Sequence, residues 1–110
     1  MMDETASKKI LSMLGLARRA GKTVCGADLA VMAVRSDKTF IVLLARDASE
    51  RTKKQLSDKC FSHNVKLIHL TASQDEMAKA AGKSSPVSAV AVTDRHFADG
   101  IAALAGEQSN

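Results

Sequence analysis

Apolar residues recur along this chain with two spacings, one typical of helices and one typical of strands. In the first segment they come at intervals of three and four residues, the spacing of one helix face: Ile10, Met13, Leu14 and Ala17. Residues 40–45 form an unbroken apolar run that is too short for a helix, which predicts a central strand covered on both faces. Residues 65–70 alternate more regularly, which predicts a strand nearer the edge of the sheet.

Residues suited to helix ends divide the chain further. Ser49, Ser73 and Asp94 suit helix starts, and Glu76 completes a capping box with Ser73. The expected elements follow in order: helix 6–20, strand 23–25, helix 26–36, strand 40–45, helix 50–63, strand 65–70, helix 73–82, strand 87–92 and helix 95–105. The helix over 26–36 is apolar nearly all round, so it is expected to be well buried. Strands that alternate with helices predict an α/β fold, here a three-layer α-β-α sandwich.

Length and composition indicate one ordinary globular domain. The 110 residues suit a single domain with its core at about residues 6–104, and 45% of them are hydrophobic and 25% charged. No apolar stretch approaches the roughly 20 residues needed to cross a bilayer. The first residues are acidic, whereas a secretory signal would begin basic and then run apolar. We therefore expect a cytoplasmic, monomeric protein that is not held by a membrane.

The residue types that carry catalysis or bind metals do not form a recognisable pattern. Cys25 and Cys60 are far apart and form no C-x-x-C pair, so both are expected to be buried and reduced, with a reactive thiol at Cys60 as the alternative. The three histidines have no second ligand at a metal-binding spacing, and no nucleophile elbow or phosphate-binding glycine motif occurs. Asp47 and Asp94 are explained as loop and helix-cap residues. We expect no enzymatic activity, metal or cofactor.

Positive charge is concentrated in the first half of the chain. Residues 1–59 carry twelve Lys and Arg against seven Asp and Glu, a net charge of +5, while the remaining residues carry a net charge of −1. Such asymmetry suggests a surface that faces a polyanion, although a basic, solvated surface explains it equally well. Three Phe and no Trp or Tyr argue against an aromatic sheet face that stacks RNA bases.

The strongest local signal is the segment from Arg18 to Gly26. Arg18, Arg19 and Lys22 precede a short strand, and Gly26 opens the following helix. A helix N-terminus offers unpaired N–H groups and a partial positive charge, which suit a phosphate, and nearby basic side chains add attraction to RNA. Solvated basic residues beside an ordinary helix start remain the alternative.

Together these segments resemble the L7Ae/L30e ribosomal protein family, and most closely its small bacterial ribosomal-protein-like members. The similarity covers about residues 8–104. It rests on the order and spacing of four stretches: Gly21-Lys22-Thr23-Val24-Cys25-Gly26, Phe40 to Ala45, Glu76 to Gly82, and Lys83-Ser84-Ser85-Pro86-Val87. The opening segment Leu14–Lys22 is typical of the bacterial members. The resemblance implies an α-β-α sandwich around a mixed four-stranded sheet. It also implies a ribonucleoprotein component that binds structured RNA, either ribosomal RNA or a kink-turn, a sharply bent internal loop with sheared G·A pairs.

The resemblance also implies where RNA would bind. Gly26 matches a glycine that lets the backbone approach RNA, and Ala27 follows it at the start of the second helix. Arg46 and Asp47 would come from the loop after the second strand. The loop before the fourth strand would meet the bases that protrude from the bend, with Lys83, Ser84, Ser85 and Pro86.

Three positions depart from the kink-turn readers of that family, many of which carry an Asn-Glu pair and, three residues on, a Lys. Asp28, Leu29 and Met32 stand there in this chain. An aspartate accepts a hydrogen bond from a guanine amino group but lacks the donor of an amide, and the other two side chains do neither. RNA binding with altered specificity is therefore expected.

The same departures support a second hypothesis, a protein–protein interaction module on the same fold. If Leu29 and Met32 are exposed, they form an apolar contact patch. If they face the sheet, they belong to the core.

Overall fold

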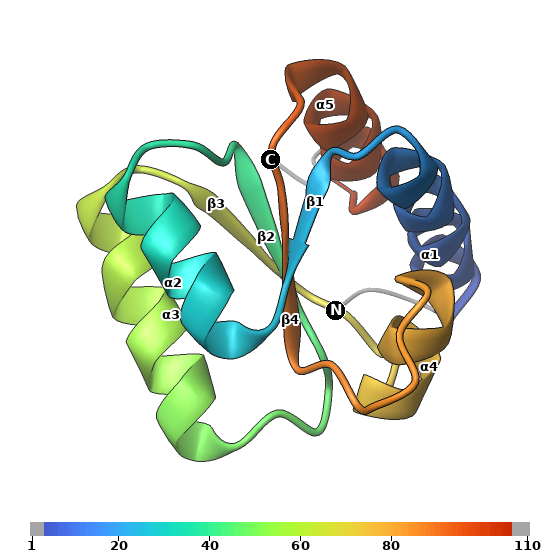
Figure 1. Cartoon of the computed structure of the whole chain (residues 1–110), viewed down its shortest axis with the longest axis horizontal. Helices are drawn as coiled ribbons and strands as arrows, with labels where there is room; N and C mark the ends of the chain where they lie inside the picture. The colour runs from blue at the N-terminus through green and yellow to red at the C-terminus, as the bar shows by residue number, and fades with distance from the viewer. Residues whose placement is uncertain (1–3, 107–110) are drawn as a thin grey trace.

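The computed structural model describes residues 4–106 and has an α/β fold of five helices around a four-stranded sheet (Figure 1). The elements are α1 (Glu4–Arg19), β1 (Thr23–Cys25), α2 (Ala27–Arg35), β2 (Ile41–Leu44), α3 (Glu50–Ser62), β3 (Lys66–His69), α4 (Gln74–Ala80), β4 (Ala89–Val92) and α5 (Arg95–Leu104). Every element expected from the sequence is present, and its bounds differ by no more than two residues at either end.

The sheet is mixed, in the order β1-β4-β2-β3. β2 pairs with β3 in parallel, while β4 pairs antiparallel with both β1 and β2. The central position of β2 and the edge position of β3 confirm the interpretation of the two apolar patterns. The register places Leu44 beside both His69 and Ala89. The ends of β2 and β3 and the start of β4 therefore lie at the same end of the sheet.

The helices cover both faces of the sheet, as expected for a three-layer sandwich (Figure 1). Ile41 and Leu43 belong to the apolar cluster that includes residues of α1, α4 and α5. Val42 and Leu44, which alternate with them, belong to the second cluster, with residues of α2 and α3. Because both faces of β2 pack against helices, all four of its residues are buried.

The helix ends follow the sequence signals. The side chains of Ser49, Ser73 and Asp94 accept hydrogen bonds from backbone N–H groups in the first turns of α3, α4 and α5. Glu76 completes the capping box by accepting from the Ser73 N–H at 2.8 Å. This hydrogen bond is the main reason that the pKa of Glu76 lies below its ordinary value. Asn64 adopts the left-handed conformation, with φ of 59°, just beyond α3.

Two expectations about burial need correction. α2 is buried only on the side that faces the sheet and α3, and Leu29 and Met32 are 51% and 58% exposed. Cys25 is half-buried, whereas Cys60 is buried as expected. Burial raises the pKa of the Cys60 thiol to about 11, which leaves little reactive thiolate at neutral pH.

Between residues 4 and 106, no helix is long and apolar enough to span a bilayer. The same residues include no group of three His, Cys, Asp or Glu side chains placed to hold a metal ion.

Candidate functional site

Three segments that are distant in the sequence meet where β1, β2 and β3 end and β4 begins, on the lower side of Figure 1. The N–H of Gly26 donates to the carbonyl of Ala89 at 2.8 Å. The N–H of Ala45 donates to Ser88 at 2.8 Å, on the same approach to β4. These bonds bring together the start of α2, the loop after β2 and the loop before β4. We call the surface formed by these three segments the candidate interface.

Gly26 gives the candidate interface an exposed helix start. Its φ of 107° and ψ of 148° lie in a region that is essentially restricted to glycine, and open space surrounds the position of a Cβ. The first intrahelical hydrogen bond runs from Ala30 N–H to Gly26 carbonyl, and no side chain caps α2. The N–H groups of Ala27, Asp28 and Leu29 therefore have no intrahelical acceptor, and the helix dipole makes this end partially positive.

Arg46 supplies a positioned cation in the loop after β2. Its Nη1 donates to the carbonyl of Thr71 at 2.9 Å, and its own N–H donates to Ala72 at 2.8 Å. The side chain remains exposed while these bonds hold the loop against the segment that follows β3. Because this bond restricts the guanidinium, less conformational entropy is lost when it meets an anion.

Asp47 fixes the same loop to α4. Its Oδ1 accepts from the N–H of Gln74 at 2.9 Å, and its carbonyl accepts from Gln74 Nε2 at 2.9 Å. The Gln74 carbonyl in turn accepts from the N–H of Val87 at 3.1 Å. Asp47 therefore links the loop after β2, through Gln74, to the loop before β4.

The loop from Lys83 to Pro86 is the most exposed part of the candidate interface. Lys83, Ser84, Ser85 and Pro86 are all exposed, whereas Val87 is buried. The Lys83 N–H donates to Ala78 at 2.8 Å, so both ends of this short loop are held by backbone hydrogen bonds. Four consecutive side chains are thus presented to solvent on an anchored backbone.

Arg18 and Arg19, at the end of α1, have different surroundings. Arg18 packs on Gly82, where a Cβ would lie only 2.7 Å from the Arg18 Nε. Its guanidinium therefore covers the backbone where the 83–86 loop begins. The sequence marks this contact only by a glycine two residues after the end of α4. Arg19 is exposed.

The structure separates Lys22 from Gly26. The Lys22 carbonyl accepts from Thr93 N–H at 2.9 Å, at the end of β4 opposite to Ala89. Four residues of extended chain span about 13 Å, so the two positions lie at opposite ends of β1. This corrects the expectation that Arg18, Arg19 and Lys22 form one basic cluster beside Gly26.

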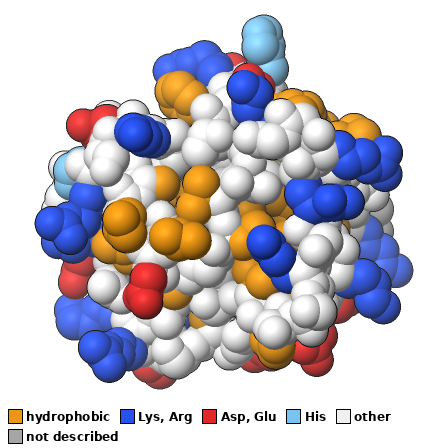
Figure 2. All heavy atoms as spheres, viewed as in Figure 1, with side chains coloured by type: hydrophobic (Ala, Val, Ile, Leu, Met, Phe, Trp, Pro, Cys, Tyr) orange, Lys and Arg blue, Asp and Glu red, His pale blue; other side chains and the backbone are white. Residues whose placement is uncertain are grey.

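Leu29 and Met32 form an apolar surface on α2. They border a shallow hollow together with Val24 and Ala33. Figure 2 shows hydrophobic side chains gathered over α2 on the face turned to the viewer. Both side chains are more than half exposed, as the hypothesis of a protein-interaction module requires.

Comparisons with known proteins agree with this architecture. The model of the ribosomal protein L7Ae/L30e/S12e/Gadd45 family matches residues 8–101. The chain is 37% identical over 97 residues to the RNA-binding protein YlxQ of Enterococcus faecium, covering 88% of this chain and 91% of that protein. It is 39% identical over 92 residues to YlxQ of Bacillus subtilis, covering 84% and 90%.

Two solved structures have similar folds. A protein of unknown function from Bacillus halodurans superposes with a TM-score of 0.84 at 35% identity, covering 90% of this chain and 98% of that one. The 15.5 kD RNA-binding protein of Giardia lamblia superposes with a TM-score of 0.84 at 19% identity, covering 97% and 90%. The second likeness concerns the fold alone.

Proposed function

Because the chain belongs to the ribosomal protein L7Ae/L30e/S12e/Gadd45 family, we propose that it is a non-enzymatic RNA-binding protein that uses the candidate interface. Its bacterial relatives are RNA-binding proteins by name. The observation that carries the proposal is the uncapped, glycine-started α2 next to two anchored, exposed loops.

Each part of the candidate interface has a physical role in this proposal. A phosphate accepts hydrogen bonds from the free N–H groups of Ala27 to Leu29, at the positive end of the helix dipole. The backbone of RNA can approach Gly26 closely because no Cβ stands there. Arg46 and Lys83 add the charge that displaces counterions, which makes affinity dependent on salt.

We propose structured RNA, either kink-turn-like or ribosomal, as the ligand, with a specificity that differs from that of other kink-turn readers. Asp28 keeps one acceptor for a guanine amino group. Leu29 and Met32 provide apolar contact where Glu and Lys would provide hydrogen bonds and charge. Each lost base contact costs about 1–3 kcal/mol of discrimination.

A titration against three RNAs tests the proposal. The RNAs are a standard kink-turn, the same RNA with its G·A pairs replaced by Watson–Crick pairs, and a plain duplex, each at two salt concentrations. Tight binding to the first alone would support kink-turn recognition. Equal, salt-dependent binding to all three would support an RNA surface with another specific target or none.

Two variants test the position of the interface. Arg46→Glu is expected to weaken RNA binding and to flatten its salt dependence. Lys22→Glu makes the same charge change at the far end of β1, so it should have the smaller effect. Equal binding by wild type and Arg46→Glu would contradict this assignment.

The exposed Leu29 and Met32 favour a second candidate function, a protein-interaction module. The absence of binding to all three RNAs would favour it. Serine at both positions would then abolish binding of the protein partner without disturbing the core. If the same double variant instead loses RNA affinity, the patch belongs to the RNA interface.

A further inference from the structure

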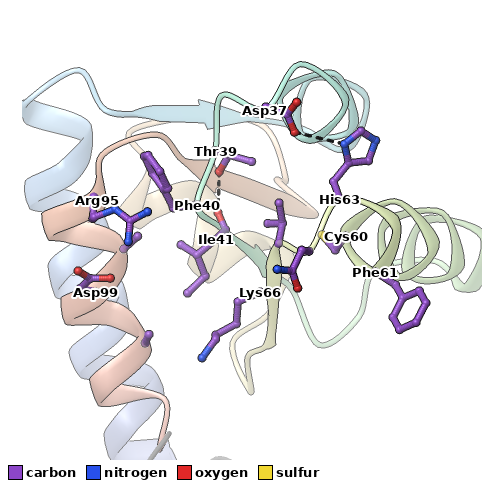
Figure 3. Close-up of a pocket in the computed structure, with 14 residues that line it drawn as sticks. Asp37, Thr39, Phe40, Ile41, Cys60, Phe61, His63, Lys66, Arg95 and Asp99 are labelled. Carbon is purple, nitrogen blue, oxygen red and sulfur yellow. Dashed lines mark hydrogen bonds and ion pairs between the residues drawn. The ribbon is translucent and has the colours of Figure 1, made fainter.

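A second hollow lies at the other end of the sheet, where β2 and β3 begin. It has a volume of about 500 Å³, within the usual range for binding pockets. Its walls come from the starts of β2 and β3, the end of α3 and one side of α5 (Figure 3). Because Gly26 lies at the opposite end of the sheet, this hollow is separate from the candidate interface.

Apolar groups form the floor of the hollow and aromatic rings stand at its rim. Ile41 and Ala98 are buried beneath it. Phe40 is 42% exposed, and Phe61, at the end of α3, is 89% exposed. Two of the three phenylalanines in the chain therefore line this one hollow and remain accessible to solvent. In Figure 3 the ring of Phe61 points outward from α3, away from the other labelled residues.

Arg95 provides a cation at the first position of α5. Its guanidinium carbon lies 4.8 Å from the centre of the Phe40 ring, so the ring holds it beside the hollow. Within residues 4–106 the Arg95 side chain forms no ion pair. It can therefore bind a carboxylate without breaking an ion pair among these residues.

Charge around the hollow favours a protein segment over a nucleic acid. Two carboxylates, Asp37 and Asp99, line it together with the cations Arg95 and Lys66, so the hollow has no excess of positive charge to attract a chain of phosphates. Asp37 Oδ1 lies 3.3 Å from His63 Nδ1, and this contact joins the ends of α2 and α3 at the rim. An apolar floor with aromatic and arginine side chains at a polar rim is typical of protein–protein contact sites.

We propose that this hollow docks a protein segment in which an aliphatic or aromatic side chain stands next to a carboxylate. The apolar side chain enters between Phe40, Ile41 and α5, and the carboxylate pairs with Arg95. Because the two surfaces lie at opposite ends of the sheet, the protein could hold RNA at one and a protein at the other. The proposal does not depend on RNA binding.

Selection of peptides tests the proposal with the full chain. A phage-displayed library of random twelve-residue peptides is panned on the immobilised protein, and the consensus peptide is synthesised and titrated by fluorescence anisotropy. The expected consensus contains Leu, Ile, Phe or Trp within a few positions of Asp or Glu. Arg95→Glu should weaken its binding at least tenfold, and Phe61→Ser should weaken it severalfold.

Control variants separate docking from folding. Leu16→Ser also removes an exposed apolar side chain, which is 51% exposed but lies on α1, outside the hollow. This control should leave peptide binding unchanged. Phe61 is almost fully exposed, so Phe61→Ser should keep the wild-type melting temperature. A glutamate at position 95 suits the start of a helix, but Arg95→Glu loses the contact with Phe40, so this variant should stay folded with a melting temperature lower by a few degrees.

Three results would overturn the proposal. The first is that no peptide is enriched above a blank surface. The second is that the enriched peptide binds Arg95→Glu as tightly as wild type. The third is that a labelled single-stranded RNA, such as twelve uridines, binds wild type and loses that binding in Arg95→Glu, which would make the occupant a nucleic acid. RNA binding at the candidate interface is measured in a separate titration, so a failure of the proposed RNA binding can be told apart from a failure of peptide docking.

Discussion

Restoring the polar residues of kink-turn readers on α2 should strengthen kink-turn binding. The variant combines Asp28→Asn, Leu29→Glu and Met32→Lys. These positions follow Gly26 on the first turns of α2, and all three side chains are exposed. Asn supplies the missing donor, Glu supplies an acceptor and Lys supplies a phosphate contact.

The expected gain can be bounded from the contacts. Two restored base contacts, at about 1–3 kcal/mol each, would give about 2–6 kcal/mol if both formed with full geometry. We expect a gain of at least tenfold in affinity, which corresponds to about 1.4 kcal/mol. The gain should be confined to RNA with sheared G·A pairs, because plain duplexes do not offer the same base edges.

The fold should tolerate these changes. Leu29 and Met32 are 51% and 58% exposed, so little buried apolar surface is lost. Removal of the Asp28 charge from the positive end of α2 costs about 0.3–1 kcal/mol, and a glutamate at position 29 offsets it. A Glu–Lys pair at positions 29 and 32 adds about 0.2–0.5 kcal/mol. The melting temperature of the triple variant should therefore stay within a few degrees of the wild-type value.

Fluorescence anisotropy with a labelled kink-turn measures the gain. The matched control is Leu16→Lys, which also raises the net charge by one on an exposed apolar position, but on α1. The reasoning is refuted if the triple variant binds the kink-turn no better than this control. It is also refuted if affinity for the RNA without G·A pairs rises by the same factor.

Three other predictions concern single residues. Gly26→Val should lower stability by about 1–3 kcal/mol, because φ is 107°, and should lower RNA affinity at least tenfold, as measured by urea unfolding and anisotropy. Glu76→Gln should be less stable than wild type at pH 7. Because the pKa of Glu76 is lowered in the folded state, the difference in unfolding free energy between wild type and variant should shrink as the pH falls below the ordinary carboxyl pKa, and it should vanish below the lowered pKa. Equal differences in unfolding free energy at pH 7 and pH 2 would contradict this prediction. Cys60 should resist iodoacetamide at pH 8 until guanidinium unfolds the chain, and mass spectrometry of the labelled peptides would reveal early labelling.

The sequence predicts the elements of this fold well because local signals agree with tertiary packing. Ser73 and Glu76 form the capping box that their spacing indicates. The apolar run 40–45 holds a strand that is buried on both faces because helices pack on both. The exposure of Leu29 and Met32 was not predictable, since a helix that is apolar nearly all round does not reveal which residues face the sheet.

The candidate interface was only partly predictable. Gly26 and the 83–86 loop stand out in the sequence, but their adjacency depends on the pairing of β1 with β4. Lys22 is close to Gly26 in sequence, yet a strand of three residues carries it to the opposite end of the sheet. The hollow beside Arg95 joins residues from four elements, and no local pattern marks such a site.

An NMR titration with kink-turn RNA tests the central claim most directly, because it locates the RNA on the protein. We expect the amide signals of Gly26 to Leu29, Arg46 and residues 83–85 to shift, while Thr39 and Asn64 at the other end of the sheet stay unchanged. Shifts that gather around Thr39, Asn64 and Arg95 would contradict the account, because RNA would then bind at the opposite end of the sheet.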